Sequence, residues 1–159
     1  MPTLRPATEA DWARLLAWRN DPDARAAFVS TEIVTVPEHR KWLTKTLADR
    51  NKLLLVAIDR AIGFAVGTAR LDRVKDVAEC SVTVDGRYRG RGYATFIVSQ
   101  LASYVPPDWR CARLVARIKQ ENTASLRTFT DAGFVYATTD KSGLVVLELA
   151  LGDFADVAD

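Results

Sequence analysis

The sequence predicts an α+β fold with a mixed, mostly antiparallel sheet, and three observations lead to this prediction. Helical periodicity dominates the N-terminal part of the chain after a short extended piece. Three strand-like segments then follow one another across short turns, as in an antiparallel meander. The rest alternates strand, helix, strand, helix and strand, which is typical of crossover connections. The 159 residues suffice for one core, so we expect a single domain over residues 1–159.

The N-terminal part predicts two helices. The first begins after Thr8, which stands three residues before Asp11 in a near match to a capping box. The second spans residues 35–49, where Thr35 and Glu38 match the same motif. One face of this second helix carries His39, Trp42, Leu43 and Thr46.

Strands are predicted where the period changes to two. Residues 53–58 form a continuous apolar run, and residues 62–71 alternate apolar with small side chains. Residues 77–84 alternate again and present two different faces. One face carries Cys80, Val82 and Val84, and the other carries Glu79, Ser81 and Thr83.

The C-terminal half predicts the crossovers. After a glycine-rich turn, helical spacing continues until the two prolines at 106–107. A strand follows over residues 111–118, and a second helix begins at Asn122 and ends at Gly133. The last strands are predicted over residues 134–138 and 143–151.

Composition limits the function classes. The formal net charge of +2 is too small to indicate nucleic-acid binding. No apolar run approaches the roughly 20 residues that span a bilayer, and the N-terminus does not resemble a signal peptide. We therefore expect no membrane partner, a cytoplasmic protein, and Cys80 and Cys111 as reduced core residues. One histidine and two separated cysteines predict no metal site.

The segment VDGRYRGRGYATFIVSQL, residues 84–101, combines three glycines and three arginines immediately before an apolar helix. The unpaired amides of a first helical turn and the helix dipole form an anion site, so a phosphate-bearing ligand is predicted. A dinucleotide fingerprint counted from Gly90 needs glycine where Thr95 stands, and the chain has no Gly-Lys-Ser/Thr triplet of a P-loop. For the side chains of Arg89 and Arg91, a solvated basic surface is the alternative.

Two motifs carry a resemblance to a known family. Residues 87–92 read R-x-x-G-x-G, which resembles the acetyl-CoA signature (Q/R)-x-x-G-x-(G/A) of the GNAT N-acetyltransferase superfamily. One strand later, NTASLRTFTDAGF at 122–134 resembles the motif N-x-x-(A/S)-x-x-x-(Y/F)-x-x-x-G-F of that family. The resemblance covers roughly residues 3–151. It implies the GNAT fold, with about six or seven strands and about four helices.

The resemblance also implies where acetyl-CoA, the expected co-substrate, binds. In similar proteins the pyrophosphate lies on backbone amides of the turn and the first helical turn, and the pantetheine arm pairs with the preceding strand. The expected contacts are Val82, Val84, Arg87, Arg89, Gly90, Arg91, Gly92, Tyr93, Ala94, Asn122 and Ser125. Asn122 can serve as a helix N-cap at the same time.

The chemistry that the resemblance implies is direct acyl transfer to a primary amine. Glu79 is the candidate base, because it lies on the strand that leads into the turn, near the catalytic glutamate of related enzymes. The alternative is a half-exposed strand glutamate. Phe129 stands where the family often has a tyrosine that protonates the leaving thiolate, which leaves Tyr93, Tyr136 or water as the donor.

The acceptor is expected to be a small-molecule amine. The segments WRNDPDAR and PEHRKWL resemble the branch with amino-sugar and ribosomal-protein N-terminal acetyltransferases. His39 and Trp42 are candidate substrate contacts that suit a sugar or a nucleobase, and packing alone is the alternative. A non-catalytic acyl-CoA-binding module and, with less support from the charge, a nucleic-acid-binding turn are the other function classes. Similar proteins are frequently homodimers.

Overall fold

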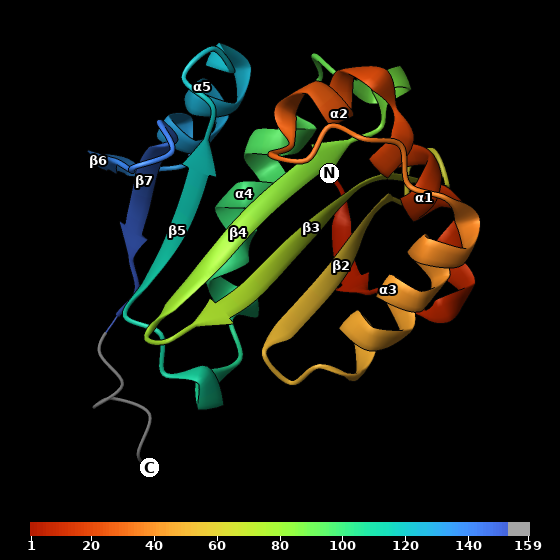
Figure 1. The fold of residues 1–159 in the computed structure, drawn as a ribbon, viewed down its shortest axis with the longest axis horizontal. Helices are drawn as coiled ribbons and strands as arrows, with labels where there is room; N and C mark the ends of the chain where they lie inside the picture. The colour runs from red at the N-terminus through yellow and green to blue at the C-terminus, as the bar shows by residue number, and fades with distance from the viewer. Residues whose placement is uncertain (153–159) are drawn as a thin grey trace.

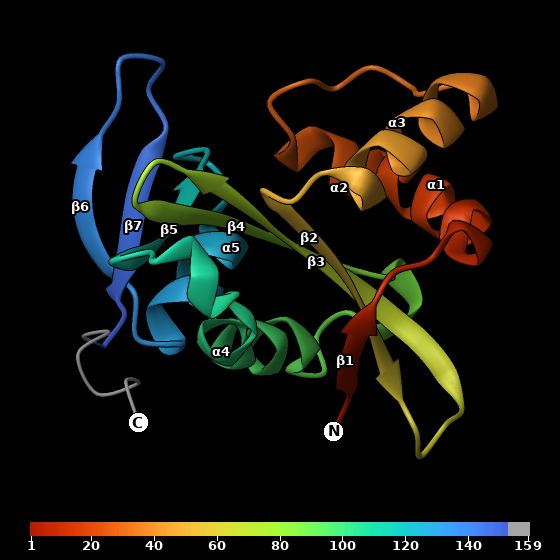
Figure 2. The same ribbon diagram turned by 90° about the horizontal axis from the view of Figure 1, so that it is seen from below.

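The computed structural model describes residues 1–152, which form one sheet with helices on both faces (Figures 1 and 2). The sheet has seven strands in the order β1-β2-β3-β4-β5-β7-β6. All neighbouring strands are antiparallel except β4 and β5, which are parallel. The strands are β1 (Thr3–Pro6), β2 (Lys52–Asp59), β3 (Phe64–Val74), β4 (Val77–Val84), β5 (Arg113–Ile118), β6 (Val135–Thr139) and β7 (Val145–Ala150). The predicted α+β class and mixed sheet are confirmed, and the predicted single domain over 1–159 extends beyond the described residues.

The helices divide between the two faces of this sheet (Figure 2). On one face lie α1 (Trp12–Asn20), α2 (Pro22–Ala27) and α3 (Val36–Ala48), and on the other lie α4 (Tyr93–Tyr104) and α5 (Thr123–Asp131). Short 3-10 turns occur at Glu9–Asp11, Gly86–Tyr88 and Pro107–Trp109. No helix within residues 1–152 has the length and apolar character needed to cross a membrane. The cytoplasmic location stays a prediction.

Each face of the sheet has its own apolar core. The larger core joins β2–β5 to α4 and α5 and includes Leu55, Leu71, Ile97 and Phe134. The smaller core joins α1 and α3 to the opposite face of β2 and includes Trp18, Leu43 and Val56. Cys80 and Cys111 are buried and unpaired, as predicted, and burial raises the pKa of the Cys80 thiol to about 12.

Helix α2 was not among the predicted elements, which placed one helix before residue 35. The Asp21 carboxylate accepts a hydrogen bond from the main-chain N–H of Ala24 at 3.0 Å, and Pro22 opens the helix. An aspartate N-cap followed by proline is a helix-start signal. The chain therefore turns at Asp21 and begins a second short helix.

The parallel pair β4–β5 is short and then opens. Pairing runs only from Val77 opposite Arg113 to Glu79 opposite Val115. Asp85 donates its main-chain N–H to Val66 of β3 at 2.8 Å, so the alternate residues Val84 and Val82 direct their main-chain groups away from β3. Within residues 1–152, this part of β4 has no strand partner on its second edge. The opening gives a ligand access to the middle of the sheet.

Candidate active site

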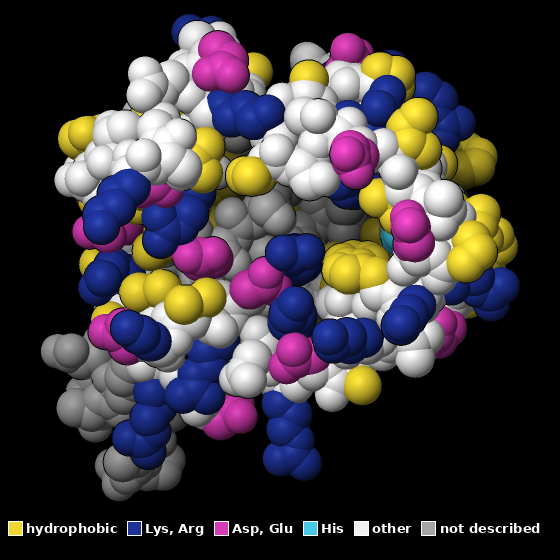
Figure 3. All heavy atoms as spheres, viewed as in Figure 1, with side chains coloured by type: hydrophobic (Ala, Val, Ile, Leu, Met, Phe, Trp, Pro, Cys, Tyr) yellow, Lys and Arg dark blue, Asp and Glu magenta, His cyan; other side chains and the backbone are white. Residues whose placement is uncertain are grey.

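A cavity of about 1200 Å³ occupies the opening between β4 and β5 and continues onto the face covered by α1–α3. Figure 3 shows a hollow near the centre of this face, with basic and acidic side chains around it. One half of the lining comes from the glycine turn (residues 86–92), α4 and α5, including Gly90, Gly92, Ala94, Asn122 and Ser125. We call the rest of the lining, from α1–α3 and the β2–β4 face, the acceptor half; it includes Arg19, His39, Trp42, Thr68 and Arg70.

The glycine turn presents bare backbone and free amides to the cavity. Gly90 and Gly92 have φ angles of +76° and +83°, and a Cβ on either would meet nothing within 4 Å. Gly92 is the N-cap residue of α4, and no side chain caps that helix. The amides at the start of α4 are therefore open to an anion, and the helix dipole favours one there. These residues fit the pyrophosphate of acetyl-CoA.

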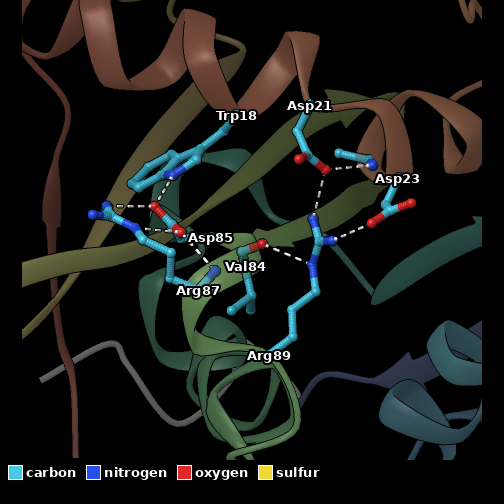
Figure 4. A network of polar contacts seen from close by, with 8 residues as sticks. Trp18, Asp21, Asp23, Val84, Asp85, Arg87 and Arg89 are labelled. Atoms are coloured by element: carbon cyan, nitrogen blue, oxygen red, sulfur yellow. Dashed lines mark hydrogen bonds and ion pairs between the residues drawn. The ribbon is translucent and has the colours of Figure 1, made fainter.

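The Arg89 guanidinium connects the glycine turn to α2, as Figure 4 shows. It lies 3.0 Å from Asp21 and 3.3 Å from Asp23, while its Nε donates to the Val84 carbonyl at 3.2 Å. The Arg89 side chain is therefore occupied by ion pairs with two aspartates, which its predicted role as a phosphate contact did not include. The carbonyl of Val84 has a partner already, which leaves Val82 as the freer main-chain position for a pantetheine arm.

A second group of contacts, around Asp85, holds the start of the turn (Figure 4). The Asp85 carboxylate accepts hydrogen bonds from the Trp18 indole at 2.8 Å and from Arg87, whose main-chain N–H and guanidinium donate at 2.9 to 3.1 Å. The Arg87 contacts, and then the Trp18 contact, hold the pKa of Asp85 well below its usual range. Asp85 is 8% exposed. The Arg87 side chain thus fixes the turn and does not line the cavity.

The second motif lies across the cavity, at the N-terminus of α5. The Asn122 side chain accepts from the Ser125 main-chain N–H at 3.1 Å, as its predicted N-cap role requires. Both residues line the cavity. Phe129 also lines it, and its ring packs edge-on against Phe134 with centroids 5.0 Å apart. No proton donor is present at the Phe129 position.

The two tyrosines considered as proton donors have other surroundings. Tyr93 donates its hydroxyl to the Asp59 carboxylate at the end of β2, and this bond raises the Tyr93 pKa. Tyr136 is 64% exposed on the edge strand β6 and lies outside the cavity lining. Tyr93 does line the cavity, but its hydroxyl is engaged by Asp59, so solvent is the remaining predicted donor.

Glu79 lies at the last paired position of β4, where the sheet begins to open. Its carboxylate accepts from the Arg117 guanidinium at 3.0 Å, and Arg117 also pairs with Asp140 at 3.2 Å. Arg117, Ser81 and Thr83 line the cavity, and Glu79 does not. A proton would reach this carboxylate through water or a hydroxyl, and the role of Glu79 as base stays a prediction.

His39 and Trp42 come together on α3, with ring centroids 5.4 Å apart, and both line the acceptor half. His39 is 2% exposed, and its Nε2 has no hydrogen-bond partner among residues 1–152. Burial lowers the pKa of His39, and a main-chain group of Trp12 opposes that effect. Burial thus disfavours the charged imidazole beside the cavity, while Trp42 also packs against the smaller core.

Several residues of the site were absent from the sequence-based prediction. Two long-range contacts hold the glycine turn. Trp18 contacts Asp85, which is 67 residues away in the chain, and Asp21 contacts Arg89, which is 68 residues away. Arg19 and Arg70 belong to the acceptor half and were not predicted to do so. Only Asp21 had a local signal, because an aspartate before Pro22 predicts a helix cap.

Comparison with known proteins links this geometry to a family. The Acetyltransferase (GNAT) domain family matches residues 3–135. A curated relative, the L-2,4-diaminobutyric acid acetyltransferase of Streptomyces coelicolor, is 41% identical over 69 residues, which are 43% of this chain and 41% of that protein. The chain thus matches less than half of the length of this relative.

Solved structures share the whole fold at low identity. The spermidine N-acetyltransferase from Vibrio cholerae, in complex with CoA and spermine, superposes with a TM-score of 0.81 at 16% identity over 96% of this chain and 97% of that one. The aminoglycoside acetyltransferase AAC(6')-Ib, in complex with coenzyme A and kanamycin, gives 0.79 at 19% identity over 94% and 95%. A Salmonella typhimurium protein with acetyl-CoA gives 0.79 at 23% identity over 96% and 95%. The family match and the fold establish that this chain belongs to the GNAT acetyltransferase family.

Proposed function

We propose that this protein transfers the acetyl group of acetyl-CoA to the primary amine of a small molecule. One observation carries the proposal: a single cavity joins the open amides of the glycine turn to the acceptor half through the opening between β4 and β5. A thioester bound along that opening would meet an amine from the α1–α3 side. The family match supports the same activity.

In the proposed reaction, a neutral amine attacks the thioester carbonyl, the new C–N bond forms, and the C–S bond breaks. The ammonium form must first lose a proton, and a positioned base typically contributes about 10²–10⁴-fold to the rate. Glu79 is our candidate, acting through water or through the hydroxyls of Ser81 and Thr83 on the same strand face. Holding the two reactants in register contributes further. The leaving thiolate takes its proton from solvent.

The acceptor is proposed to be a small amine such as a nucleotide-linked amino sugar. The positions of His39 and Trp42 support an acceptor with an apolar or ring-shaped body, because both residues line the acceptor half. A protein N-terminal amine and a non-catalytic acyl-CoA module are the alternatives. The second is weakened by the size of the acceptor half, which extends the cavity beyond what the cofactor residues line.

Thiol release in the presence of acetyl-CoA tests the proposal. The purified protein is incubated with amino-sugar nucleotides, diamines and diamino acids, polyamines, aminoglycosides and peptides with free N-termini. Turnover of small amines supports the proposal, and turnover of peptides alone supports the protein acetyltransferase. Thermal protection by acetyl-CoA without turnover of any class favours the binding module. Absence of both contradicts the acetyltransferase proposal.

The role of Glu79 is tested on the best acceptor by Glu79→Gln. We expect kcat to fall about 10²–10⁴-fold, with acetyl-CoA affinity unchanged. Glu148→Gln is the matched control, because Glu148 also pairs with a strand arginine, Arg113, at 3.1 Å and is similarly exposed, at 35% against 33%. Equal activities of the two variants would remove Glu79 from the mechanism.

A further inference from the structure

Arg19 is held in a fixed position at the C-terminal end of α1, where it lines the acceptor half. Its guanidinium lies over the Phe28 ring, 4.5 Å from the centroid. Its Nη2 donates to the Ser30 carbonyl at 3.0 Å. Stacking and one hydrogen bond orient the plane of the group, and the planar fork of an arginine recognises carboxylate and phosphate groups.

The positive charge of Arg19 lacks a counter-charge in the described chain. Its Nη1 is buried and has no hydrogen-bond partner among residues 1–152, and the same holds for Nε of Arg25. Arg25 contributes a second positive charge, and its Nη1 donates only to the Thr31 carbonyl, at 3.3 Å. Burial and then Arg25 lower the pKa of Arg19, although a guanidinium stays protonated in proteins. Buried, unpaired donors of this kind are rare in folded proteins.

Three other arginines of the cavity lining differ from Arg19 in having carboxylate partners. Arg70 pairs with Asp72 at 2.7 Å. Arg117 pairs with Glu79 and Asp140, and Arg89 pairs with Asp21 and Asp23. Arg127 of α5 lies on the opposite side, away from the acceptor half. Arg19 is therefore the cation of the acceptor half whose charge is left for a ligand, as far as residues 1–152 are concerned.

Two carboxylates line the cavity, those of Asp23 and Glu38, and both residues are exposed. Asp23 pairs with Arg89, and the Glu38 carboxylate accepts the Thr35 main-chain N–H at 3.1 Å as part of a helix cap. A polycation such as a polyamine brings several ammonium groups, each of which loses water on binding and needs an acceptor. The unpaired cation Arg19 thus favours an anion, whereas the two carboxylates of the lining are exposed and Asp23 already has a cationic partner.

Building on the proposed acetyltransfer, we infer that the acceptor is an amine that also carries an anionic group, a carboxylate or a phosphate, and that Arg19 binds this group. Arg25 lies outside the cavity lining and adds positive charge near Arg19. Arg19 would then hold the anionic end of the acceptor, so that the amine at its other end faces β4. Arg19 is a specificity-determining residue in this arrangement.

The first test compares acceptors that differ only in the anion. For the carboxylate we use L-2,4-diaminobutyrate and its decarboxylated counterpart 1,3-diaminopropane; for the phosphate, glucosamine 6-phosphate and glucosamine, with spermidine as the polycation. We expect kcat/KM to be about 10- to 100-fold higher for the anionic member of one pair, the range of a hydrogen-bonded charge. The pair that shows this difference in kcat/KM tells whether Arg19 binds a carboxylate or a phosphate.

The second test uses variants on the preferred pair. Arg19→Gln is expected to lose that 10- to 100-fold preference, mainly through a higher KM for the anionic member of the pair. Arg19→Lys is expected to retain part of the preference. Arg14→Gln is the matched control, because Arg14 is exposed on the same helix and lies outside the cavity lining.

Three results would overturn the inference: equal kcat/KM within both pairs, a preference for spermidine, or no turnover of any anionic amine by a protein that acetyl-CoA still protects thermally. None of these results concerns acetyl-CoA binding. The proposed function is therefore decided separately, by the turnover of the wider panel of amines described above. Absence of thermal protection would instead count against the proposed function itself. If Arg19→Gln does not fold, the substrate pairs on the unchanged protein decide.

Discussion

At the scale of single residues, Gly90 combines a left-handed backbone with open space in front of it. Asparagine and aspartate both tolerate a positive φ and have nearly the same shape, so they separate charge from conformation. A carboxylate at this position would face the phosphates that the turn is expected to bind. The position therefore tests the predicted pyrophosphate site with a matched pair of variants.

We predict that Gly90→Asp weakens acetyl-CoA binding by about 100-fold or more, because like charges a few ångströms apart repel strongly in a partly buried site. Gly90→Asn should lose much less. Isothermal titration with acetyl-CoA measures both. Similar losses in the two variants would mean that the backbone conformation, and not the charge, controls binding.

His39 makes the stability of the protein depend on pH. Its folded pKa lies below the ordinary 6.5, mainly because of burial. The unfolded chain therefore binds the extra proton first as the pH falls. Stability from this residue is fully present above pH 6.5 and is lost between 6.5 and the lower folded pKa.

We predict that His39→Gln flattens the pH dependence of unfolding below pH 6.5, where wild-type stability should fall by at most about 1.4 kcal/mol per pH unit from this group. Urea unfolding at pH 8.0, 6.5 and 5.5 measures it, and any packing loss in the variant appears equally at every pH. Parallel curves for the two proteins would show that His39 does not titrate differently on folding.

At the scale of elements, Gly67 of β3 sets how closely β4 approaches. A Cβ on Gly67 would lie 2.6 Å from the Thr83 carbonyl oxygen, which belongs to backbone and cannot turn aside. The strand would have to shift at Thr83, beside the main-chain positions expected to meet the pantetheine arm. The close contact thus links the sheet packing to the site.

We predict that Gly67→Ala lowers the free energy of unfolding by about 1–3 kcal/mol, as overpacking does, and also weakens acetyl-CoA binding. Gly86→Ala is the control, since its Cβ would stay 3.7 Å from the nearest atom. Chemical denaturation and titration with acetyl-CoA measure the two effects. A fully stable Gly67→Ala protein would mean that β4 moves freely here.

Asp85 connects the end of β4 to α1 and to the glycine turn. Asp85→Asn removes a charge that Arg87 and Trp18 both contact. We predict a loss of about 1–3 kcal/mol in the free energy of unfolding, because the buried Trp18 indole loses its charged acceptor. Asp108→Asn, at an exposed aspartate, should cost little.

The stabilisation by Asp85 also depends on pH. Because the folded pKa of Asp85 is depressed below 3.8, its contribution to the free energy of unfolding is present above that pH and is lost as the pH falls further.

The sequence predicts local features of these elements well and their mutual contacts poorly. Alternation over residues 77–84, the cap at Asn122 and the glycines at 90 and 92 each act through neighbouring residues, and the structure has them in the predicted elements. The direction of the Arg89 side chain depends on Asp21 and Asp23, which are 68 and 66 residues away in the chain. Because these partners are so distant in the chain, the sequence predicted a phosphate contact for Arg89 and did not reveal its two ion pairs.

At the scale of the whole molecule, a ligand that binds only the folded chain stabilises it by mass action. We predict that acetyl-CoA at about 100 times its Kd adds about 2.7 kcal/mol, which for a chain of this size raises Tm by roughly 5–10 °C. Differential scanning fluorimetry measures the shift, and pantetheine, which lacks the phosphates of CoA, is the control for the phosphate contribution. A Tm independent of acetyl-CoA would argue against a cofactor site in the folded protein.

The bridge from Arg89 to Asp21 and Asp23 attaches the cofactor side of the cavity to α2, next to the acceptor half. We expect this bridge to transmit a displacement of the turn on acetyl-CoA binding to α2, which borders the proposed acceptor site. Reciprocity of binding free energies then requires the acceptor to alter the affinity for acetyl-CoA by the same factor as acetyl-CoA alters that for the acceptor. The two substrates of this protein would be coupled through one guanidinium, and Arg89→Gln would uncouple them.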